Sequence, residues 1–536
     1  MSLTIAGPDA PSGTRRRGRR RLKRGADHLV ALGPFLLISV VVFHYSPDDA
    51  LITARYAANA LRGEGLVFNP GEPVEGFSSP LHLALTVVLT ALPGGYFLLK
   101  MKLMSIAFGV LTLIASVKLV RAAGLRRWAR LLALGAIGGS WALAVSSTNG
   151  LETSLVAFLT TLLAALLIGG EHVTRPAVTG VVAGALAITR PESMLIVLLL
   201  VLAVAVRPDV RGYRASLHWV AGPMLAVAAL VVARLAYFGS VVPNTYHAKE
   251  TGAVEGLVTA SRYVRKSQPV WDTLDRPGAT AALVVQFALV CAAVVLVHRH
   301  RRALLPLAAV VVGQAVFVLT SGGDWMRGAR FLAPLLPALA VLLVIGLVAV
   351  VDRCLPGRGR TAIGAALAAA VLAATCWPVT SAFSPVWRTA SFDDRSLVEV
   401  GNSDFDGASS RLWAMGPDLV ACLGPGSSVA YTEMGYFGFA RQDLHIIDMR
   451  GLTDAEIART APDEARTFYG IADREWFDAD SAIGRILTER RPEMILSFDA
   501  EPRSTVLGGD YLLDRVVVWG PLTPLGVYVR KDFSCG

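Results

Sequence analysis

The stretch LVALGPFLLISVVVFHYSPDDALITARYAANAL, residues Leu29–Leu61, places two adjacent acids directly behind a long apolar run. The run from Leu29 to Tyr45 is long enough to cross a hydrocarbon core of about 30 Å. A charged side chain costs roughly 2.5–3.5 kcal/mol at the centre of a membrane helix. We therefore expect Asp48 and Asp49 to lie at a membrane edge, at the end of the first span.

Composition indicates a polytopic membrane protein. The 536 residues are 54% hydrophobic and 17% charged, with a mean hydropathy of +0.52. The net charge of +10 would suit a nucleic-acid binder, but residues 381–536 carry about 15 basic and about 24 acidic side chains. The basic surplus therefore lies upstream, in short loops between spans, where retention of Lys and Arg in the cytoplasm places it. We expect the lipid bilayer as a partner and no nucleic acid.

The apolar runs divide the chain into three parts. We predict a basic cytoplasmic tail over 1–28, a polytopic α-helical membrane domain over 29–380, and an extracytoplasmic soluble α/β domain over 381–536, where short β-rich runs replace the long apolar ones. The segment Pro80–Leu99 is interrupted by Pro93-Gly94-Gly95, so we read it as an interfacial or re-entrant helix. The predicted spans, about eleven, are Leu29–Tyr45, Leu103–Val120, Leu131–Val145, Ser154–Ile168, Val178–Ile188, Ser193–Val206, Leu217–Tyr237, Ala279–Val297, Ala303–Thr320, Phe331–Val351 and Thr361–Trp377.

This span count lets every basic loop fall on one side of the membrane. The positive-inside rule then places the N-terminus in the cytoplasm and the C-terminal domain outside, in a multi-pass plasma-membrane protein. The polar N-terminus has no evident processing site, so we expect an uncleaved first span. The five cysteines show no metal-binding spacing, and Cys422 and Cys535 could pair in an oxidising compartment.

The acidic pair allows two interpretations. Ser46 is a good N-cap, Pro47 suits the first helical position, and acids in the first turn complement the helix dipole, so capping alone could explain Asp48 and Asp49. The following helix, Ala50–Leu61, is mildly amphipathic: Leu51, Ala54, Ala58 and Leu61 can lie on the membrane, while Arg55, Asn59 and Arg62 face water. Such an interfacial helix would present both carboxylates at the outer surface, where one could act as a general base.

Other polar residues gather on the same outer side. SGGDWMRGARF carries Asp324, Arg327 and Arg330, which either snorkel to head groups or bind a specific anion. VPNTYHAKE adds Tyr246, His247 and Lys249, which could equally form an ordinary solvated loop. Glu152 and the Arg190/Glu192 pair sit at outer helix ends, and a structural ion pair is the simpler reading for the second.

The acidic pair, the amphipathic helix behind it, the second interfacial segment and about eleven spans resemble the GT-C class of membrane glycosyltransferases. Within that class, DDALITARYAANALRGEGLVFNPGEPVEGFSS, NGLETS, TRPES, PNTYHAKE and GGDWMRGARF look like the motif series of the actinobacterial arabinofuranosyltransferase group. The resemblance implies an inverting enzyme that moves a sugar, arabinofuranose in that group, from a decaprenyl-phosphate type of donor. The acceptor would be a hydroxyl of a cell-envelope glycan such as arabinogalactan, on the outer membrane face.

The resemblance also implies roles for residues. Asp48 or Asp49 would be the base, and sequence alone does not decide which. Arg330, Arg327 and Lys249 would neutralise the donor phosphate, with Arg55 behind them. We expect the remaining candidates to bind substrate: Asp324, Glu152, Tyr246, His247, and in the C-terminal domain Tyr431 and Asp448, where Tyr436 and Phe437 are better explained by core packing.

No motif requires a cofactor, although a carboxylate pair facing a phosphate is able to recruit Mg²⁺ or Mn²⁺. Two other functions fit the same spans. A transporter or flippase of a lipid-linked sugar would be expected to show repeated halves or mid-span ionisable pairs, and neither is evident in the sequence. A non-catalytic scaffold would use Asp48 and Asp49 only as helix caps.

Overall fold

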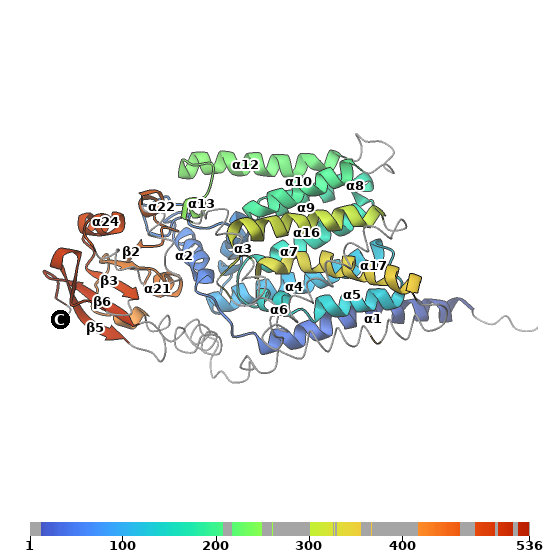
Figure 1. The fold of residues 1–536 in the computed structure, drawn as a ribbon, viewed down its shortest axis with the longest axis horizontal. Coiled ribbons are helices and arrows are strands. Elements are labelled where there is room, and N and C mark those ends of the chain that lie inside the picture. The colour runs from blue at the N-terminus through green and yellow to red at the C-terminus, as the bar shows by residue number, and fades with distance from the viewer. Residues whose placement is uncertain are drawn as a thin grey trace, which may run out of the picture.

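The computed structural model describes residues 12–206, 217–248, 260, 301–324, 326, 330–354, 366, 416–460, 478–498, 502–517 and 524–534. Helices run along one elongated body, and a small α/β domain built from the C-terminal residues lies at one end of it (Figure 1). The helices of the body are α1 (Ser12–Val41), α2 (Asp49–Leu61), α3 (Pro80–Thr90), α4 (Phe97–Ala122), α5 (Arg127–Gly138), α6 (Trp141–Ser146), α7 (Thr153–Ile168), α8 (Glu171–Thr174), α9 (Pro176–Ala187), α10 (Pro191–Ala205), η1 (His218–Val220), α12 (Ala221–Phe238), α13 (Asn244–Ala248), α16 (Arg301–Ser321), η3 (Arg330–Leu335) and α17 (Leu336–Cys354).

Several of these helices can cross a membrane. Among the described residues, four are long and apolar enough: Phe97–Ala122, His218–Phe238, Leu304–Ser321 and Arg330–Arg353. Five shorter apolar helices accompany them: Gly25–Val41, Pro80–Thr90, Thr153–Ile168, Pro176–Ala187 and Pro191–Ala205. Because Ala279–Val297 and all of Thr361–Trp377 except residue 366 lie outside the described residues, the count of about eleven spans stays a prediction.

The expected span Leu131–Val145 is wrong in one respect, because the structure divides it into α5 and α6. The break falls at Gly139 and Ser140, and the hydroxyl of Ser140 accepts a hydrogen bond from the N–H of Leu143, so that it caps α6. The predicted interruption of Pro80–Leu99 is confirmed: α3 ends at Thr90, and α4 begins at Phe97.

Small residues allow a close helix contact in the body, between α9 and α12. A Cβ atom on Gly222 would lie 2.2 Å from the carbonyl oxygen of Gly180, so neither position accommodates a side chain without a shift of the backbone. Close approach through small residues is the usual means by which membrane helices associate, because lipid gives apolar side chains no preference for each other. This contact fixes α12 on the outside of the body, above α9 and α10 (Figure 1).

The C-terminal domain is a mixed sheet with the strand order β2-β1-β3-β6-β5-β4. The strands β1, β2 and β3 are parallel, and β6, β5 and β4 extend the sheet in antiparallel pairs. Short β-branched runs bounded by turns form these strands, as the sequence predicts. The elements are β1 (Ser428–Tyr431), α21 (Gly435–Ala440), β2 (His445–Asp448), α22 (Ala455–Thr460), α24 (Ala482–Arg490), β3 (Met494–Phe498), β4 (Thr505–Val506), η8 (Leu507–Gly509), β5 (Tyr511–Val517) and β6 (Leu525–Arg530).

The C-terminal domain shares a hydrophobic core with the helical body. Tyr56 of α2, with Phe68 and Phe77 from the loop after it, belongs to the same buried cluster as Tyr431 and Phe437 of the domain. The helix α2 lies between the bundle and the sheet, with α21 beside it (Figure 1). The segment that carries the acidic pair is therefore enclosed by both parts of the chain.

Candidate active site

A buried lysine fixes the segment that leads to the acidic pair. The Nζ atom of Lys102 on α4 donates hydrogen bonds to the carbonyl oxygens of Phe43 (2.8 Å), Tyr45 (2.7 Å) and Thr148 (2.7 Å). Because α1 ends at Val41, carbonyls in this region lack helical partners, and a cation satisfies them. The lysine thus holds the chain immediately before Asp48.

Asp48 caps a helix of the C-terminal domain and not its own helix. Its two carboxylate oxygens accept hydrogen bonds from the backbone N–H groups of Gly435 and Tyr436, both at 2.6 Å, at the start of α21. Its side chain makes no capping bond to α2. Burial raises the pKa of Asp48, the Tyr436 N–H opposes the rise and the negative charge of Asp49 adds to it, which gives a pKa of about 6.

Asp49 is the more accessible of the two acids. It is the first residue of α2, and 26% of its side chain is exposed, while Asp48 as a residue is 3% exposed. One carboxylate oxygen of Asp49 lies 3.8 Å from Nη2 of Arg330, which begins η3. An accessible carboxylate next to a buried guanidinium is an arrangement that can accept a proton on one side and bind an anion on the other.

Arg330 belongs to a chain of buried ion pairs. It pairs with Asp324, while Arg190 pairs with Glu152 and Glu192. Burial alone would raise the pKa of Glu152, but the charges of Arg190 and Arg330 lower it to about 2. The predicted Arg190–Glu192 pair is confirmed. Asp324 and Glu152 also lie in this network, as partners of the two arginines, and their expected contacts with substrate stay predictions.

The expected role of Arg55 in phosphate binding is wrong in this structure. Its guanidinium is fully buried and donates to the carbonyl oxygens of Phe68 (2.7 Å), Gly438 (2.7 Å) and Leu444 (2.9 Å), as well as to Asn69 Oδ1 (3.3 Å). These contacts use four of the five N–H donors, and the side chain has no exposed surface on which a phosphate could bind. Arg55 instead holds the C-terminal domain against α2.

The orientation expected for α2 is accordingly corrected. Arg55 and Asn59 do not face water: both are buried, and Asn59 donates to the carbonyl oxygens of Val67 (2.8 Å) and Phe68 (3.0 Å). Arg62 is exposed, as predicted. A polar helix face therefore meets a folded domain here, and not solvent.

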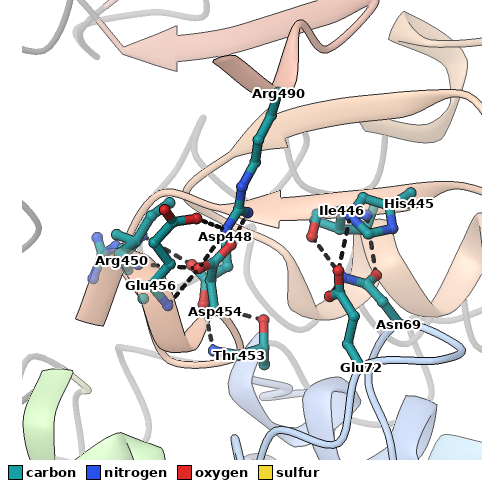
Figure 2. Close-up of polar contacts among 12 residues, drawn as sticks. Asn69, Glu72, His445, Ile446, Asp448, Arg450, Thr453, Asp454, Glu456 and Arg490 are labelled. Carbon is teal, nitrogen blue, oxygen red and sulfur yellow. Dashed lines mark hydrogen bonds and ion pairs between the residues drawn. The ribbon is translucent and has the colours of Figure 1, made fainter. Parts of the chain in front are cut away.

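Two predicted acceptor-binding residues of the C-terminal domain are also enclosed. Asp448 has no exposed surface, and its carboxylate accepts from the N–H groups of Arg450 (2.9 Å) and Thr453 (2.7 Å), so that it shapes the turn after β2 (Figure 2). Tyr431 is 1% exposed and packs edge-on against Phe437. Neither can present a surface to a glycan, and both predictions are wrong for the docked domain. The alternative of core packing for Tyr436 and Phe437 fits their burial.

Two asparagines that the sequence analysis did not single out complete the docking of the domain. Asn69 pairs with the open edge of β2, accepting from the N–H of Ile446 (3.1 Å) and donating to its carbonyl (2.9 Å), beside the contact between Glu72 and His445 (Figure 2). Asn244 of α13 donates to three carbonyls of the turn 451–454. Each satisfies backbone groups that would otherwise be buried without partners.

The structure describes only some of the remaining candidate residues. Tyr246 is exposed and His247 half-buried on α13, so their expected roles stay predictions. Arg327 and Lys249 lie outside the described residues. Within the described part of the chain, no three His, Cys, Asp or Glu side chains are grouped so as to hold a metal ion. Cys422 is disulfide-bonded, and Cys535 lies outside the described residues.

The helical body, with the α/β domain docked at one end, has the GT-C fold of membrane glycosyltransferases. ArnT from Cupriavidus metallidurans has this fold: its apo structure superposes with a TM-score of 0.52 at 14% identity, over 96% of this chain and 98% of that one. Its structure bound to undecaprenyl phosphate gives a TM-score of 0.50 at 13% identity over the same shares.

In sequence, the chain is 30% identical over 349 residues to the terminal beta-(1→2)-arabinofuranosyltransferase of Mycobacterium tuberculosis. The match covers 56% of this chain and 52% of the relative, so the chain spans about half the length of the protein that it matches. Residues 407–529 match a family model described as a domain of unknown function (DUF8728). The resemblance to GT-C glycosyltransferases and to the arabinofuranosyltransferase group that the motifs indicate is confirmed.

Proposed function

We propose that this protein is an inverting membrane glycosyltransferase that moves a sugar from a polyprenyl-phosphate donor to a hydroxyl group of a glycan. The observation that carries the proposal is the accessible carboxylate of Asp49, 3.8 Å from the buried guanidinium of Arg330. A base and an anion-binding cation at this distance suit a reaction in which an acceptor loses a proton and a phosphate leaves. The GT-C fold and the similarity to the arabinofuranosyltransferase support the same reaction class.

In this mechanism Asp49 is the base and Asp48 an anchor. Asp49 accepts the proton of the acceptor hydroxyl while the oxygen of that hydroxyl attacks the anomeric carbon of the donor sugar. The bond between that carbon and the phosphate oxygen breaks from the opposite face, and the electron pair leaves with the lipid phosphate. Arg330 stabilises the negative charge that develops on the leaving oxygen. Asp48 is less suited to be the base, because α21 occupies both of its carboxylate oxygens.

The donor sugar that we propose is arabinofuranose on a decaprenyl phosphate, and the acceptor is a cell-envelope glycan at the outer face of the plasma membrane. The sugar rests on the similarity to the mycobacterial enzyme. The disulfide bond of Cys422 supports an oxidising compartment for the C-terminal domain, because such bonds are rare in the cytosol. The basic loops of the body support the matching orientation, with the N-terminus in the cytoplasm.

Transfer by the purified full-length protein in nanodiscs tests the proposal. We expect radiolabelled sugar to pass from decaprenyl-phosphoryl arabinose to a synthetic arabinoside, and the product to have inverted anomeric configuration by NMR. Parallel reactions with other polyprenyl-phosphate sugars identify the donor. Transfer from a different sugar would keep the reaction class and replace arabinose, whereas no transfer from any such donor would contradict the proposed function.

We further expect transfer to rise with pH through about 6, where Asp48 loses its proton. Ionised Asp48 places a second negative charge beside Asp49, and this charge favours transfer of the acceptor proton to the base. The contribution of Asp48 to the free energy of unfolding changes with pH in the opposite direction to the rate of transfer. Because the folded-state pKa of Asp48 lies above its ordinary value of 3.8, its contribution to folding is present at low pH and is lost as the pH rises through about 6. Initial rates and melting temperatures over the same pH range measure both trends, and a flat rate profile would contradict the assignment.

A further inference from the structure

We propose that a pocket in the helical body binds an anionic phospholipid of the bilayer. The pocket has a volume of about 530 Å³ and lies between α1, α4, α7 and α8. The side chains that line it include Ile114, Val117, Lys118, Arg121, Ala165 and Glu171. None of its lining residues belongs to the candidate active site, so the inference goes beyond the proposed function and does not rest on it.

The first support is the position of the pocket along α4, a helix long and apolar enough to cross a membrane. This helix begins beside the C-terminal domain, where the ring of Phe97 lies 5.2 Å from that of Phe439. Lys118 lies about six turns further along α4, a distance of about 32 Å by the rise of an α-helix. That is close to the thickness of a hydrocarbon core, about 30 Å. The pocket therefore lies at the end of the body away from the sheet, at the other membrane boundary (Figure 1).

The second support is the order of apolar and charged residues in the lining. On α4, Lys118 follows Ile114 by one helical turn, and Arg121 follows Val117 in the same way, so each basic residue shares a helix face with an apolar one. The charged member of each pair is the nearer to the end of the helix. Ile114 is 44% exposed, and in a membrane-spanning body an exposed apolar side chain of this kind contacts lipid. A phospholipid has the same order, with its charge at the boundary and its chains towards the membrane interior.

The third support is the number of donors that the two cations retain. Nζ of Lys118 lies 2.6 Å from Oε1 of Glu171, and the Lys118 side chain is 40% exposed. Arg121 donates through Nε (3.1 Å) and Nη2 (2.7 Å) to Asp27, and its side chain is 35% exposed. An ammonium group has three donors and a guanidinium group five, so these contacts leave both cations able to bind phosphate oxygens.

The charge near the pocket is complementary to an anionic head group. His28 of α1 also lines the pocket, and the sequence just before it, RRRGRRRLKR at residues 15–24, carries eight basic residues. Asp27 is largely buried and is neutralised by Arg121. A basic segment beside a membrane helix attracts anionic lipids, and basic pockets between membrane helices bind their head groups. The proposed orientation places this end of the body in the cytoplasmic leaflet, where anionic lipids would meet it.

Two substitutions in one ion pair test the inference. Full-length protein is placed in nanodiscs of phosphatidylcholine with or without phosphatidylglycerol, and the phosphatidylglycerol that it retains is measured by native mass spectrometry. We expect Lys118→Gln to reduce the retained lipid several-fold, because a donor to the phosphate is lost, and Glu171→Gln to increase it, because a competing carboxylate is removed. Both variants break the same pair, so a purely structural role of this pair would change retention in the same direction. The matched control is Arg126→Gln, at an exposed basic residue that pairs with Asp352 and does not line the pocket.

Melting temperatures in the same nanodiscs supply a second measurement. Because a ligand of the folded state stabilises it, phosphatidylglycerol should raise the melting temperature of the wild type and of Arg126→Gln, but not that of Lys118→Gln. Ile114→Trp, which fills the apolar side of the pocket without a change of charge, should also reduce retention and the rise in melting temperature. Equal retention by the wild type and Lys118→Gln, or an equal loss in Arg126→Gln, would overturn the site. A rise as large with inorganic phosphate in pure phosphatidylcholine would overturn the assignment to a lipid. None of these measurements uses sugar transfer, so a failure of the proposed function would leave them unchanged.

Discussion

Asp49→Asn is expected to lower kcat/KM for sugar transfer by about 10²–10⁴-fold, the usual contribution of a general base. The amide has nearly the volume of the carboxylate but cannot take the proton from the acceptor hydroxyl. Because Asp49 makes its described ion pair at 3.8 Å and keeps a quarter of its side chain exposed, its loss should change the melting temperature by only a few degrees. Steady-state transfer in nanodiscs and thermal unfolding of the same samples measure the two effects.

Asp48→Asn should give the opposite pattern. An amide at this position can accept only one of the two N–H bonds from α21, and its NH₂ group would face the second donor, so docking of the C-terminal domain is weakened. We expect a clear fall in melting temperature and a smaller loss of transfer than for Asp49→Asn. The exposed Asp480 supplies the matched control, since Asp480→Asn should change neither quantity.

These variants also separate the alternatives that the sequence leaves open. If Asp49→Asn transfers sugar as fast as the wild type, the acids have only a structural role. That result would support the interpretation of the protein as a non-catalytic scaffold. If Asp48→Asn alone loses transfer while keeping its melting temperature, then Asp48 is the base. A loss in Asp49→Asn with the fold intact supports the mechanism proposed above.

In this protein the sequence predicts the bounds of helices better than it predicts which parts of the chain they pack against. The helix after the acidic pair was expected over Ala50–Leu61 and is found over Asp49–Leu61. Its polar face was expected to meet water, yet Arg55 is buried against residues almost 400 positions later in the chain. A polar face indicates only that a helix side is not in lipid. It cannot distinguish solvent from the carbonyl groups of a folded domain.

The same limit explains which site residues the sequence analysis missed. Asn69, Asn244 and Lys102 act on backbone carbonyls, and carbonyls carry no signal in the sequence. Lys102 could have been noticed in the sequence, because it is an ionisable residue directly before the apolar run expected from Leu103. In the structure it lies inside α4. An ionisable residue within a membrane helix is rare enough to deserve a named partner. Arg330 and Asp324, by contrast, were both singled out as candidate site residues of one loop, although their pairing with each other was not predicted, and the structure pairs them.

The second large effect is expected for Arg55→Met, which should release the C-terminal domain from the helical body. The substitution keeps the length of the side chain and removes all its donors, so the carbonyls of Phe68, Gly438 and Leu444 lose a buried partner. Each unsatisfied group costs about 1–3 kcal/mol. Burial lowers the pKa of Arg55 to about 10, so the guanidinium is still charged at neutral pH and its hydrogen bonds are the stronger, charge-assisted kind.

Two readouts distinguish docking from phosphate binding. If Arg55 holds the domain, Arg55→Met makes the full-length protein in nanodiscs more sensitive to protease and lowers kcat, because α21 no longer binds Asp48. If Arg55 instead binds the donor phosphate, the same variant raises KM for the donor and leaves protease resistance unchanged. Arg459→Met, at an exposed position of α22, is the control for the substitution itself. Arg55→Lys should have a protease sensitivity and a kcat between those of the wild type and Arg55→Met. An ammonium group cannot reach the carbonyls of Gly438 and Leu444 together as the planar guanidinium does.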